Sequence, residues 1–423
     1  MHRTAGIISI GDELAIGQTL DTNSQWLSGR LTELGVGVRR HVTVADDLDA
    51  IALELERCAR EFDLVIVSGG LGPTADDLTR FAFARVLGDE LVTDDASLDQ
   101  VRAWFTASGR SMPRANAVQA ERPASASMIA NAHGTAPGLF ARVHDCDVWC
   151  VPGPPSELRP IFQAAIVPRI RTERVVVTRV LRTAGLGEST IAERLSAMMA
   201  RDRNPLVGTT ASDGVVSCRV RYEGDDRNEG RRLVDAAIDQ VRETLGAYVF
   251  GEDDQTQAGA IVALLAERRK TVATVESCTG GLLAGAITAV PGSSSVFEKG
   301  LVTYSNEQKT DLVGVPSWIF RQQGAVSQAC VEAMAKEGLE LAKSDYCLSV
   351  SGVAGPGGGS EDKPVGTVWI CRAAADGSLD TRRFLFNGGR DAVRQRSVTA
   401  ALVMLWLRLV RAEGLPLLAQ VEP

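Results

Sequence analysis

The feature that most constrains the fold of this chain is an alternation of short apolar runs with longer segments of helical spacing across residues 1–172. The short runs, Ile7–Ile10 and Asp63–Ser68, have the length and composition of strands that are buried on both faces. The segments Asn23–Leu34 and Ala50–Arg60 carry apolar residues at the spacing of amphipathic helices. Strands that alternate with helices in this way predict a parallel, doubly wound α/β sheet. Ligands bind such sheets beyond the carboxyl ends of the strands, here in the turns that follow the two apolar runs.

Two further segments follow this N-terminal one. Residues 173–253 contain two strand-like and two helical stretches, which predicts a small α+β module. Residues 254–423 alternate strands and helices again and end in an amphipathic helix over Asp391–Glu413, which Gly414 is expected to stop. The polar stretch Gly251–Gln257 is typical of a linker. The predicted fold class is therefore α/β, with a doubly wound N-terminal domain, a small α+β module and a C-terminal α/β domain.

The composition of the 423-residue chain fits an ordinary globular enzyme, with 45% apolar and 23% charged residues. Its net charge of −8 argues against general nucleic-acid binding, which needs a basic surface. No secretory signal is visible, and the longest apolar run, Ala401–Leu407, is too short to cross a bilayer. A cytoplasmic location without membrane attachment is therefore expected. The eight cysteines form no CxxC pair, which favours reduced, mostly buried thiols over zinc ligands or disulfides.

The positions of the histidines restrict the chemistry of the C-terminal domain. The four histidines are His2, His41, His133 and His144, so none lies in that domain. A Ser-His-Asp or Cys-His site is therefore excluded there, and so is a histidine-rich zinc site. Any activated nucleophile must use another base, for which lysine is the obvious candidate.

Ser277 is the candidate nucleophile. It follows the predicted strand Thr271–Val275 and precedes the predicted helix Leu282–Ala289, in a turn that also contains Thr279 and Gly280. The N–H groups at the start of a helix can hold an oxyanion or a phosphate. The alternative is that Ser277 only caps the helix, as serine often does.

Lys309 is the candidate base. It follows the predicted strand Gly300–Thr303, and Asn306 is expected to cap a helix whose first turn contains the lysine. The positive end of the helix dipole and partial burial both lower a lysine pKa. A neutral amine can take the proton from Ser277 and give it to departing ammonia. The alternative is an ordinary surface lysine.

Two glycine-rich turns complete the C-terminal set. The first, Ser351–Gly359, contains Gly352 and Gly357 and lets backbone N–H groups approach a ligand closely. The second places Arg390 after two glycines at the start of the last helix, which suits a phosphate group. The alternatives are a flexible loop and a surface arginine.

These turns carry a family resemblance. It rests on ESCTGG (276–281), TYSNEQK (303–309), SGVAGPGGG (351–359), KPVGT (363–367) and GRDAVR (389–394), which resemble the nicotinamide-nucleotide amidase domain. The resemblance implies hydrolysis of the carboxamide of nicotinamide mononucleotide to nicotinic acid mononucleotide and ammonia, without a cofactor. The family's serine, tyrosine and lysine match Ser277, Tyr304 and Lys309, and its loop residues and arginine match Ser351, Gly352 and Arg390. Ser351 stands where the family often has threonine, and Gly389 where it often has an acidic residue.

The N-terminal motifs resemble a second domain of the same proteins. GDELAIGQTLDTNSQWL (11–27), SGGLGPTADDLT (68–79), NAHGTAPG (131–138) and VPGPPSEL (151–158) are similar to the molybdopterin-binding-like domain of the CinA family. The middle module resembles that family's KH-type insertion, and the whole chain resembles a full-length member. The resemblance implies metal-dependent hydrolysis of ADP-ribose to AMP and ribose 5-phosphate, and a homodimer.

The residues near the second strand suit this N-terminal activity. Gly69, Gly70 and Gly72 follow a parallel strand and can cradle a pyrophosphate. Asp76, Asp77 and Asp46 are candidate ligands of a divalent metal (Mg, Mn or Co), with potassium as a further candidate cation. The alternative is that these aspartates only cap a helix.

The middle module contains a short loop that fits the G-x-x-G pattern of KH domains, Gly185–Glu188. The loop ends in glutamate, and a capping-box pattern at Thr190–Glu193 follows, so a structural role is expected and nucleic-acid binding is not. Two other functions stay open: an ADP-ribose pyrophosphatase with a non-catalytic C-terminal domain, and a competence-related regulatory protein.

Overall fold

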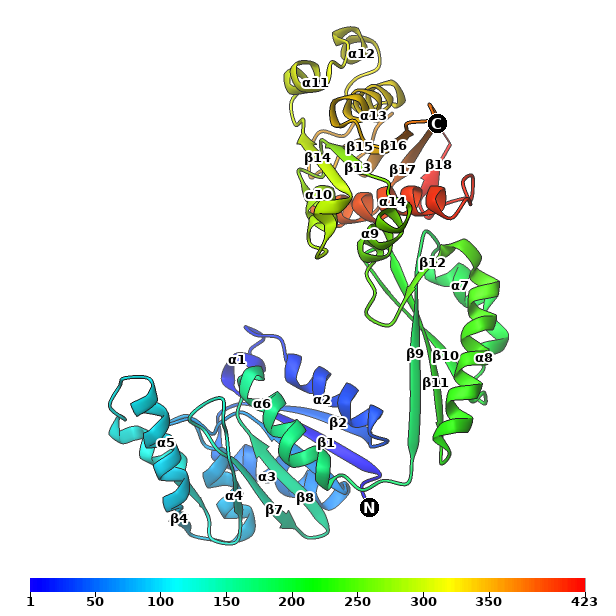
Figure 1. Cartoon of the computed structure of the whole chain (residues 1–423). Coiled ribbons are helices and arrows are strands. Elements are labelled where there is room, and N and C mark those ends of the chain that lie inside the picture. The colour runs from blue at the N-terminus through cyan, green and yellow to red at the C-terminus, as the bar shows by residue number, and fades with distance from the viewer. Residues whose placement is uncertain (423) are drawn as a thin grey trace. The chain divides into compact units, whose positions relative to one another are not determined.

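The computed structural model describes residues 1–422 and divides into two compact units (Figure 1). The first consists of Met1–Val177 with Glu223–Gly230, and the second of Thr178–Tyr222 with Arg231–Pro423. Within the described residues, no helix is both long enough and apolar enough to cross a membrane. All eight cysteines are buried and unpaired, as the sequence predicts.

The N-terminal part alternates strands and helices as expected. They are β1 (Thr4–Ile10), α1 (Asp12–Ala15), α2 (Thr22–Glu33), β2 (Gly37–Val44), α3 (Leu48–Glu61), β3 (Leu64–Ser68), α4 (Thr79–Leu87), β4 (Leu91–Thr93), α5 (Asp95–Ala107), β5 (Glu121–Pro123), β6 (Ser127–Ile129), β7 (Gly138–Val143), β8 (Cys146–Val151) and α6 (Pro155–Ile161).

The main sheet of this part has the order β2-β1-β3-β8-β7-β6. The first four strands are parallel, whereas β7 and β6 are antiparallel to their neighbours, so the sheet is mixed at one edge. Successive side chains of β1 point to opposite faces of the sheet. Ile7 packs with α2 and α6, and Ile8 packs with α3 and α4. Two apolar cores on one sheet explain why these strands are apolar throughout.

The middle module is a four-stranded sheet with the order β10-β11-β9-β12 and two helices. Its elements are β9 (Val175–Ala184), α7 (Glu188–Arg194), β10 (Leu206–Ser212), β11 (Val215–Gly224), α8 (Arg227–Leu245) and β12 (Val249–Glu252). Sequence reasoning missed β10, whose exposed polar residues do not read as a strand, and assigned part of β12 to the linker. The α+β character of the module is as predicted.

The C-terminal domain is a six-stranded sheet with the order β14-β13-β15-β16-β17-β18. In Figure 1, α13 covers one face, and α9 and α14 cover the other. The elements are α9 (Gln257–Arg268), β13 (Val272–Glu276), α10 (Leu282–Thr288), β14 (Phe297–Val302), α11 (Asn306–Val313), α12 (Ser317–Gln322), α13 (Gln328–Ala342), β15 (Tyr346–Gly352), β16 (Thr367–Ala374), β17 (Leu379–Leu385), α14 (Arg390–Leu409) and β18 (Gln420–Val421).

The topology of this sheet brings the four C-terminal motifs to one edge. Strands β13, β14 and β15 are parallel, so the turns that follow them lie at the same end. β16 and β17 are antiparallel, and their register puts the end of β17 beside the end of β15, because Gly352 pairs with Val368 and Thr367 pairs with Leu385. The turn that leads into α14 therefore reaches this edge as well. α14 ends at Leu409, earlier than the predicted Glu413.

A glycine in α13 tests this packing. A Cβ atom at Gly338 would lie 2.3 Å from Val275 Cγ2 and 2.8 Å from Cys347 Sγ, because the helix lies directly on β13 and β15. We expect Gly338→Ala to destabilise the protein by about 1–3 kcal/mol through overpacking, measured by thermal unfolding. Gly285→Ala in α10 is the matched control. Its Cβ would meet nothing within 4 Å, so it should be neutral or slightly stabilising. Equal midpoints for the two variants would contradict this packing.

Candidate functional site

The central contact of the C-terminal domain joins two residues that are 32 positions apart. Ser277 lies in the turn after β13, and Lys309 is on α11, the helix after β14. Their Oγ and Nζ atoms are 3.0 Å apart. Lys309 Nζ also lies 2.8 Å from the carbonyl oxygen of Thr303 and 3.3 Å from that of Tyr304. The expected meeting of hydroxyl and amine is therefore present.

Burial disfavours the charged form of this amine. Lys309 is 1% exposed and Ser277 is 8% exposed, and within the described residues no carboxylate lies at ion-pair distance from Lys309. Burial lowers the pKa of Lys309, because a charged amine without a carboxylate partner is poorly solvated there. The helix start is also corrected: Ser305, not Asn306, caps α11 by accepting a hydrogen bond from the Gln308 amide. Burial is the largest cause of the shift.

A buried carboxylate beside Ser277 organises the start of α10. Glu276 has no exposed surface, and its carboxylate accepts hydrogen bonds from the amides of Gly281, Leu283 and Ala284 at 2.8–3.0 Å. It therefore satisfies N–H groups that a helix start leaves without partners. Ser277 does not cap this helix, because the Glu276 carboxylate binds the free amides at its start. The glutamate precedes Ser277 in the sequence, and sequence reasoning gave it no role.

Tyr304 and Arg390 form a second group at the same edge. The Arg390 guanidinium donates 2.8 Å hydrogen bonds to the Gly355 carbonyl and to the Tyr304 hydroxyl. Tyr304 is 59% exposed, and its side chain contacts the arginine rather than Ser277 or Lys309. The tyrosine side chain therefore lies with Arg390, and only its backbone carbonyl reaches Lys309.

The predicted substrate-binding residues differ in their availability. Ser351 is buried and donates a 2.7 Å hydrogen bond to the Ala325 carbonyl, so its hydroxyl is committed to the fold. Gly352 is needed for packing, since a Cβ there would lie 2.8 Å from the Thr367 carbonyl oxygen. Gly357, in contrast, is exposed with open space around it. Thr279 is fully buried, and its hydroxyl has no hydrogen-bond partner within the described residues.

The N-terminal motifs line a separate cavity of about 380 Å³. The loop after β3 forms one wall, and a Cβ at Gly69 or Gly70 would lie under 2.5 Å from the Ile10 carbonyl or the Thr79 hydroxyl. Arg80 holds this loop from behind: it is 2% exposed and donates to the carbonyls of Leu71 and Gly72. Burial lowers the pKa of Arg80 to about 10. Its apolar setting in α4 gave no hint of this role.

The three candidate metal ligands line that cavity but are not equivalent. Asp77 accepts hydrogen bonds from the amides of Gly72 and Thr74, so it holds its own loop and does not cap α4, whose N-cap residue is Leu78. Asp76 is exposed, and Asp46 accepts a bond from the Asp12 amide. Among residues 1–422 no group of three or more His, Cys, Asp or Glu side chains is arranged to hold a metal.

The donor set nevertheless fits a divalent cation bound together with a phosphate. Burial, followed by the nearby carboxylates of Asp12, Asp76 and Glu13, raises the pKa of Asp46. This crowding of negative charge favours a cation. Mg²⁺ commonly uses one or two carboxylates and takes its other ligands from water and substrate phosphates. Asp46 and Asp76 would hold it, whereas Asp77 is engaged by the loop.

Comparison with known proteins assigns the chain to a family. Three family models match consecutive parts: a probable molybdopterin binding domain over residues 6–172, the damage-inducible protein CinA KH domain over 178–251, and the CinA C-terminal domain over 254–409. A CinA-like protein from Geobacter sulfurreducens is 41% identical over 406 residues, 95% of this chain and 97% of that protein. The chain belongs to the CinA family. The resemblance seen in the motifs is therefore confirmed.

A second relative agrees with this assignment. A CinA-like protein from Geobacter metallireducens is 40% identical over 406 residues, 95% of this chain and 98% of that protein. The crystal structure of the competence/damage inducible protein CihA from Agrobacterium tumefaciens is 39% identical, covers 36% of this CinA chain and 93% of its own, and aligns with a TM-score of 0.36.

The G-x-x-G loop of the KH module is covered by the C-terminal tail of the same unit. Leu418 donates its amide to the Gly185 carbonyl at 2.8 Å, and a Cβ at Gly185 would lie 2.8 Å from Leu417. Tyr248 donates a 2.8 Å hydrogen bond to the Pro416 carbonyl, which holds the tail from a second side. The loop therefore has the structural role that the sequence predicted.

Glu276 supplies a stability test of this site. Glu276→Gln keeps the shape but turns an amide NH₂ group toward backbone N–H donors, so we expect a loss of about 2–3 kcal/mol in the free energy of unfolding. Glu298→Gln, on the exposed surface of β14, is the control and should leave the midpoint of chemical denaturation unchanged. A Glu276→Gln midpoint equal to that control would show that the carboxylate does not hold the start of α10.

Proposed function

We propose that this CinA-family protein is an amidase that hydrolyses the carboxamide of nicotinamide mononucleotide. The observation that carries the proposal is the 3.0 Å contact between Ser277 Oγ and the buried Lys309 Nζ. A neutral amine has two N–H donors and one lone pair. The carbonyls of Thr303 and Tyr304 take the two N–H groups, which leaves the lone pair to accept the hydroxyl proton of Ser277. The amine is thus arranged as a base.

The reaction then follows in two halves. Ser277 Oγ attacks the carboxamide carbon while Lys309 takes its proton, and the lysine passes that proton to the leaving nitrogen as ammonia departs. Water attacks the resulting ester, loses its proton to Lys309 and releases the carboxylate, and the proton returns to Ser277. The backbone N–H groups of Cys278 and Thr279, which have no protein acceptor within the described residues, are the candidate oxyanion donors.

Arg390 supports the choice of a nucleotide substrate. It is the first residue of α14, directly after Gly389, and the start of a helix suits an anion. Its two hydrogen bonds, to Gly355 and Tyr304, fix the side chain and leave further N–H donors for a phosphate. A phosphate there and a carboxamide at Ser277 would occupy the two ends of one site.

The nucleophile and base are tested by Ser277→Ala and Lys309→Met. Each should lower ammonia release from nicotinamide mononucleotide by at least about a thousandfold, because the members of a nucleophile–base pair act as a unit. Lys336→Met, a substitution of an exposed lysine on α13, is the control and should keep full activity. Ammonia is measured with a coupled assay, and thermal unfolding checks that each variant folds. Undiminished turnover in either site variant would contradict the mechanism.

The pH dependence of the same reaction reports the lysine. The base must be neutral, and burial lowers the pKa of Lys309 from the ordinary lysine value of 10.5. The rate kcat/KM should therefore rise with pH and level off below 10.5. A profile that keeps rising beyond 10.5, or falls through this range, would exclude a neutral Lys309 as the base.

A second proposal concerns the N-terminal cavity: we infer that it hydrolyses ADP-ribose to AMP and ribose 5-phosphate with a divalent metal. The supporting observation is the cavity lined by the glycine loop together with the carboxylates of Asp46 and Asp76. Gly69, Gly70 and Gly72 let the backbone approach a pyrophosphate closely. A bound metal would neutralise phosphate charge, and Asp46 and Asp76 would hold it.

A pair of neighbouring aspartates tests this second activity. Asp76→Asn should abolish metal-dependent AMP release from ADP-ribose without changing stability, because Asp76 is exposed. Asp77→Asn should instead lower the midpoint of thermal unfolding, because Asp77 holds the amides of Gly72 and Thr74. Ammonia release from nicotinamide mononucleotide is the internal control for both. Full AMP release by Asp76→Asn would contradict the assignment, and AMP release without ammonia in the unaltered protein would favour a pyrophosphatase alone.

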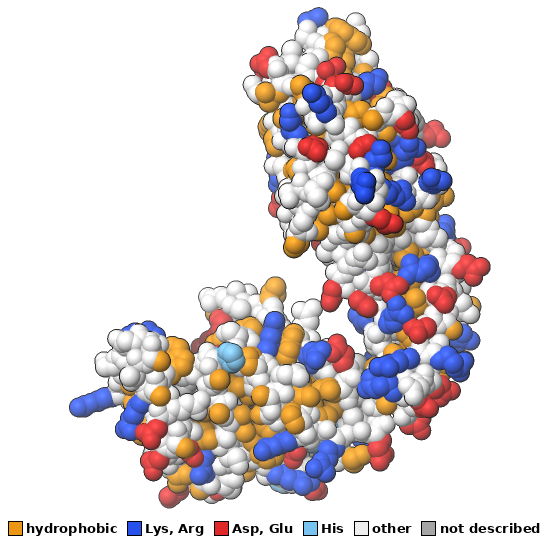
Figure 2. Space-filling view, viewed as in Figure 1, with side chains coloured by type: hydrophobic (Ala, Val, Ile, Leu, Met, Phe, Trp, Pro, Cys, Tyr) orange, Lys and Arg blue, Asp and Glu red, His pale blue; other side chains and the backbone are white. Residues whose placement is uncertain are grey.

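We also infer that the KH module does not bind nucleic acid. The loop that would grip a nucleic-acid backbone is packed against residues 417–418. On the face shown in Figure 2, Lys and Arg side chains are interspersed with Asp and Glu side chains. Both observations speak against a DNA-binding regulatory role. Salt-dependent DNA binding by the whole protein would revive that role.

A further inference from the structure

The turn that carries Ser277 is held from one side by an arginine of α14. Arg394 Nε donates to the Cys278 carbonyl at 3.1 Å, and Arg394 Nη2 donates to the Thr279 carbonyl at 2.9 Å. One guanidinium therefore binds two successive peptide carbonyls. Arg394 does not contact Ser277 or Lys309, so its influence on the reaction must pass through the turn.

The geometry of this turn leaves one peptide plane without a hydrogen bond to the backbone. The Gly280 amide donates to the Ser277 carbonyl at 3.0 Å, which closes a β-turn over residues 277–280. The Ser277 amide donates to the Val350 carbonyl at 2.9 Å. The central peptide, between Cys278 and Thr279, has no backbone partner within the described residues.

The central peptide of a β-turn can adopt two opposite orientations. Type I and type II turns differ mainly in the direction of this peptide. In a trans peptide the carbonyl and the N–H point in opposite directions. Arg394 binds the Cys278 carbonyl, so the Thr279 N–H is turned away from the arginine. Reversal of this peptide would exchange that N–H for a carbonyl oxygen, which repels an oxyanion.

Thr279 opposes the same reversal sterically. A type II turn needs a positive φ at its third residue, which is disfavoured for a side chain other than glycine. Thr279 is not among the residues with positive φ. The orientation of the central peptide thus has two restraints, one steric and one from the Arg394 hydrogen bond.

We propose that Arg394 is a positioning residue of the amidase, which keeps the Thr279 N–H oriented as an oxyanion donor. The role rests on the amidase function proposed for Ser277. Arg390, four residues earlier on α14, is the candidate phosphate ligand, so one helix turn carries both the binding arginine and the positioning arginine.

The experiment compares Arg394→Lys and Arg394→Met with the unaltered protein. Lysine keeps the charge but cannot bind two carbonyls in a fixed fork, and methionine keeps neither donor nor charge. Loss of one oxyanion donor lowers kcat by about a hundredfold or more. We expect kcat to fall at least about tenfold for lysine and further for methionine, with KM for nicotinamide mononucleotide within about twofold.

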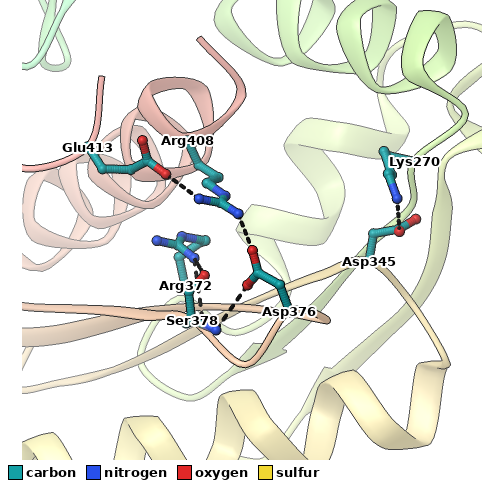
Figure 3. A network of polar contacts seen from close by, with 7 residues as sticks. All are labelled: Lys270, Asp345, Arg372, Asp376, Ser378, Arg408 and Glu413. Atoms are coloured by element: carbon teal, nitrogen blue, oxygen red, sulfur yellow. Dashed lines mark hydrogen bonds and ion pairs between the residues drawn. The ribbon is translucent and has the colours of Figure 1, made fainter. Parts of the chain in front are cut away.

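The control is an arginine at the other end of the same helix. Arg408 donates hydrogen bonds to Asp376 and Glu413 (Figure 3). Arg372 donates a hydrogen bond to Ser378 in the same polar network. Arg408→Lys should leave kcat unchanged even where it lowers the midpoint of thermal unfolding. This pair separates a loss of stability from a loss of orientation.

A double-mutant cycle with Thr279→Gly sharpens the test. Glycine removes the steric restraint, so the loss of kcat caused by Arg394→Lys should be larger in the Thr279→Gly background than in the unaltered chain. Binding of the product nicotinic acid mononucleotide should stay the same across the Arg394 variants, because it has no tetrahedral oxyanion. Effects on kcat that simply add would show that the two residues do not restrain the same peptide.

The outcomes distinguish the two proposals. No ammonia release by the unaltered protein overturns the amidase function and the role of Arg394 with it. Ammonia release by the unaltered protein, together with kcat for Arg394→Lys and Arg394→Met within about twofold of it, overturns the role of Arg394 alone. A loss confined to KM would make Arg394 a substrate-binding residue and would also contradict its positioning role.

Discussion

An amine buried without a carboxylate partner is the constraint on which the C-terminal site depends. Lys309 reaches the interior of the domain, where its neighbours are two backbone carbonyls and one serine hydroxyl. A charged lysine would be poorly solvated there, and the nearby backbone dipoles do not replace a carboxylate. A neutral amine avoids this cost of desolvation and can still form hydrogen bonds with the same three groups. The same arrangement makes Ser277 the natural proton donor.

The parallel arrangement of three strands explains how distant motifs build this site. The turns after β13, β14 and β15 lie at one edge of the sheet, and the register of β16 and β17 brings the start of α14 to the same edge. Each turn then contributes a different group: the hydroxyl, the amine, a glycine loop and the arginines. Glu276 holds the amides at the start of α10, and Arg394 holds two carbonyls of the Ser277 turn just before it. The fold thus orients this turn before any substrate binds.

Sequence reasoning reached the Ser277–Lys309 contact because both residues follow strands that periodicity and composition reveal. It did not find the roles of Arg394 and Arg80. Both arginines bind backbone carbonyls, and the spacing of apolar residues does not indicate such contacts. The partner of Tyr304 was missed for a related reason: side-chain direction depends on tertiary packing. The family and the α/β fold class were predictable from ordered motifs.

Local capping explains other differences between sequence and structure. Ser305 rather than Asn306 caps α11, and Asp77 holds its own loop, because several neighbouring polar residues can serve as caps and only the backbone path selects one. Strand β10 was missed because its outward residues are polar and exposed. The antiparallel strands β7 and β6 follow from a short hairpin, whose direction the count of apolar residues does not specify.

Direct titration of the lysines tests the central claim. The chain has six lysines, Lys270, Lys299, Lys309, Lys336, Lys343 and Lys363, so carbon-13 labelling at Cε gives few NMR signals. One signal should titrate below the ordinary value of 10.5 and be missing from the spectrum of Lys309→Met. Titration of Lys309 at or above 10.5 would mean a charged amine beside Ser277, and the account of the site would be wrong.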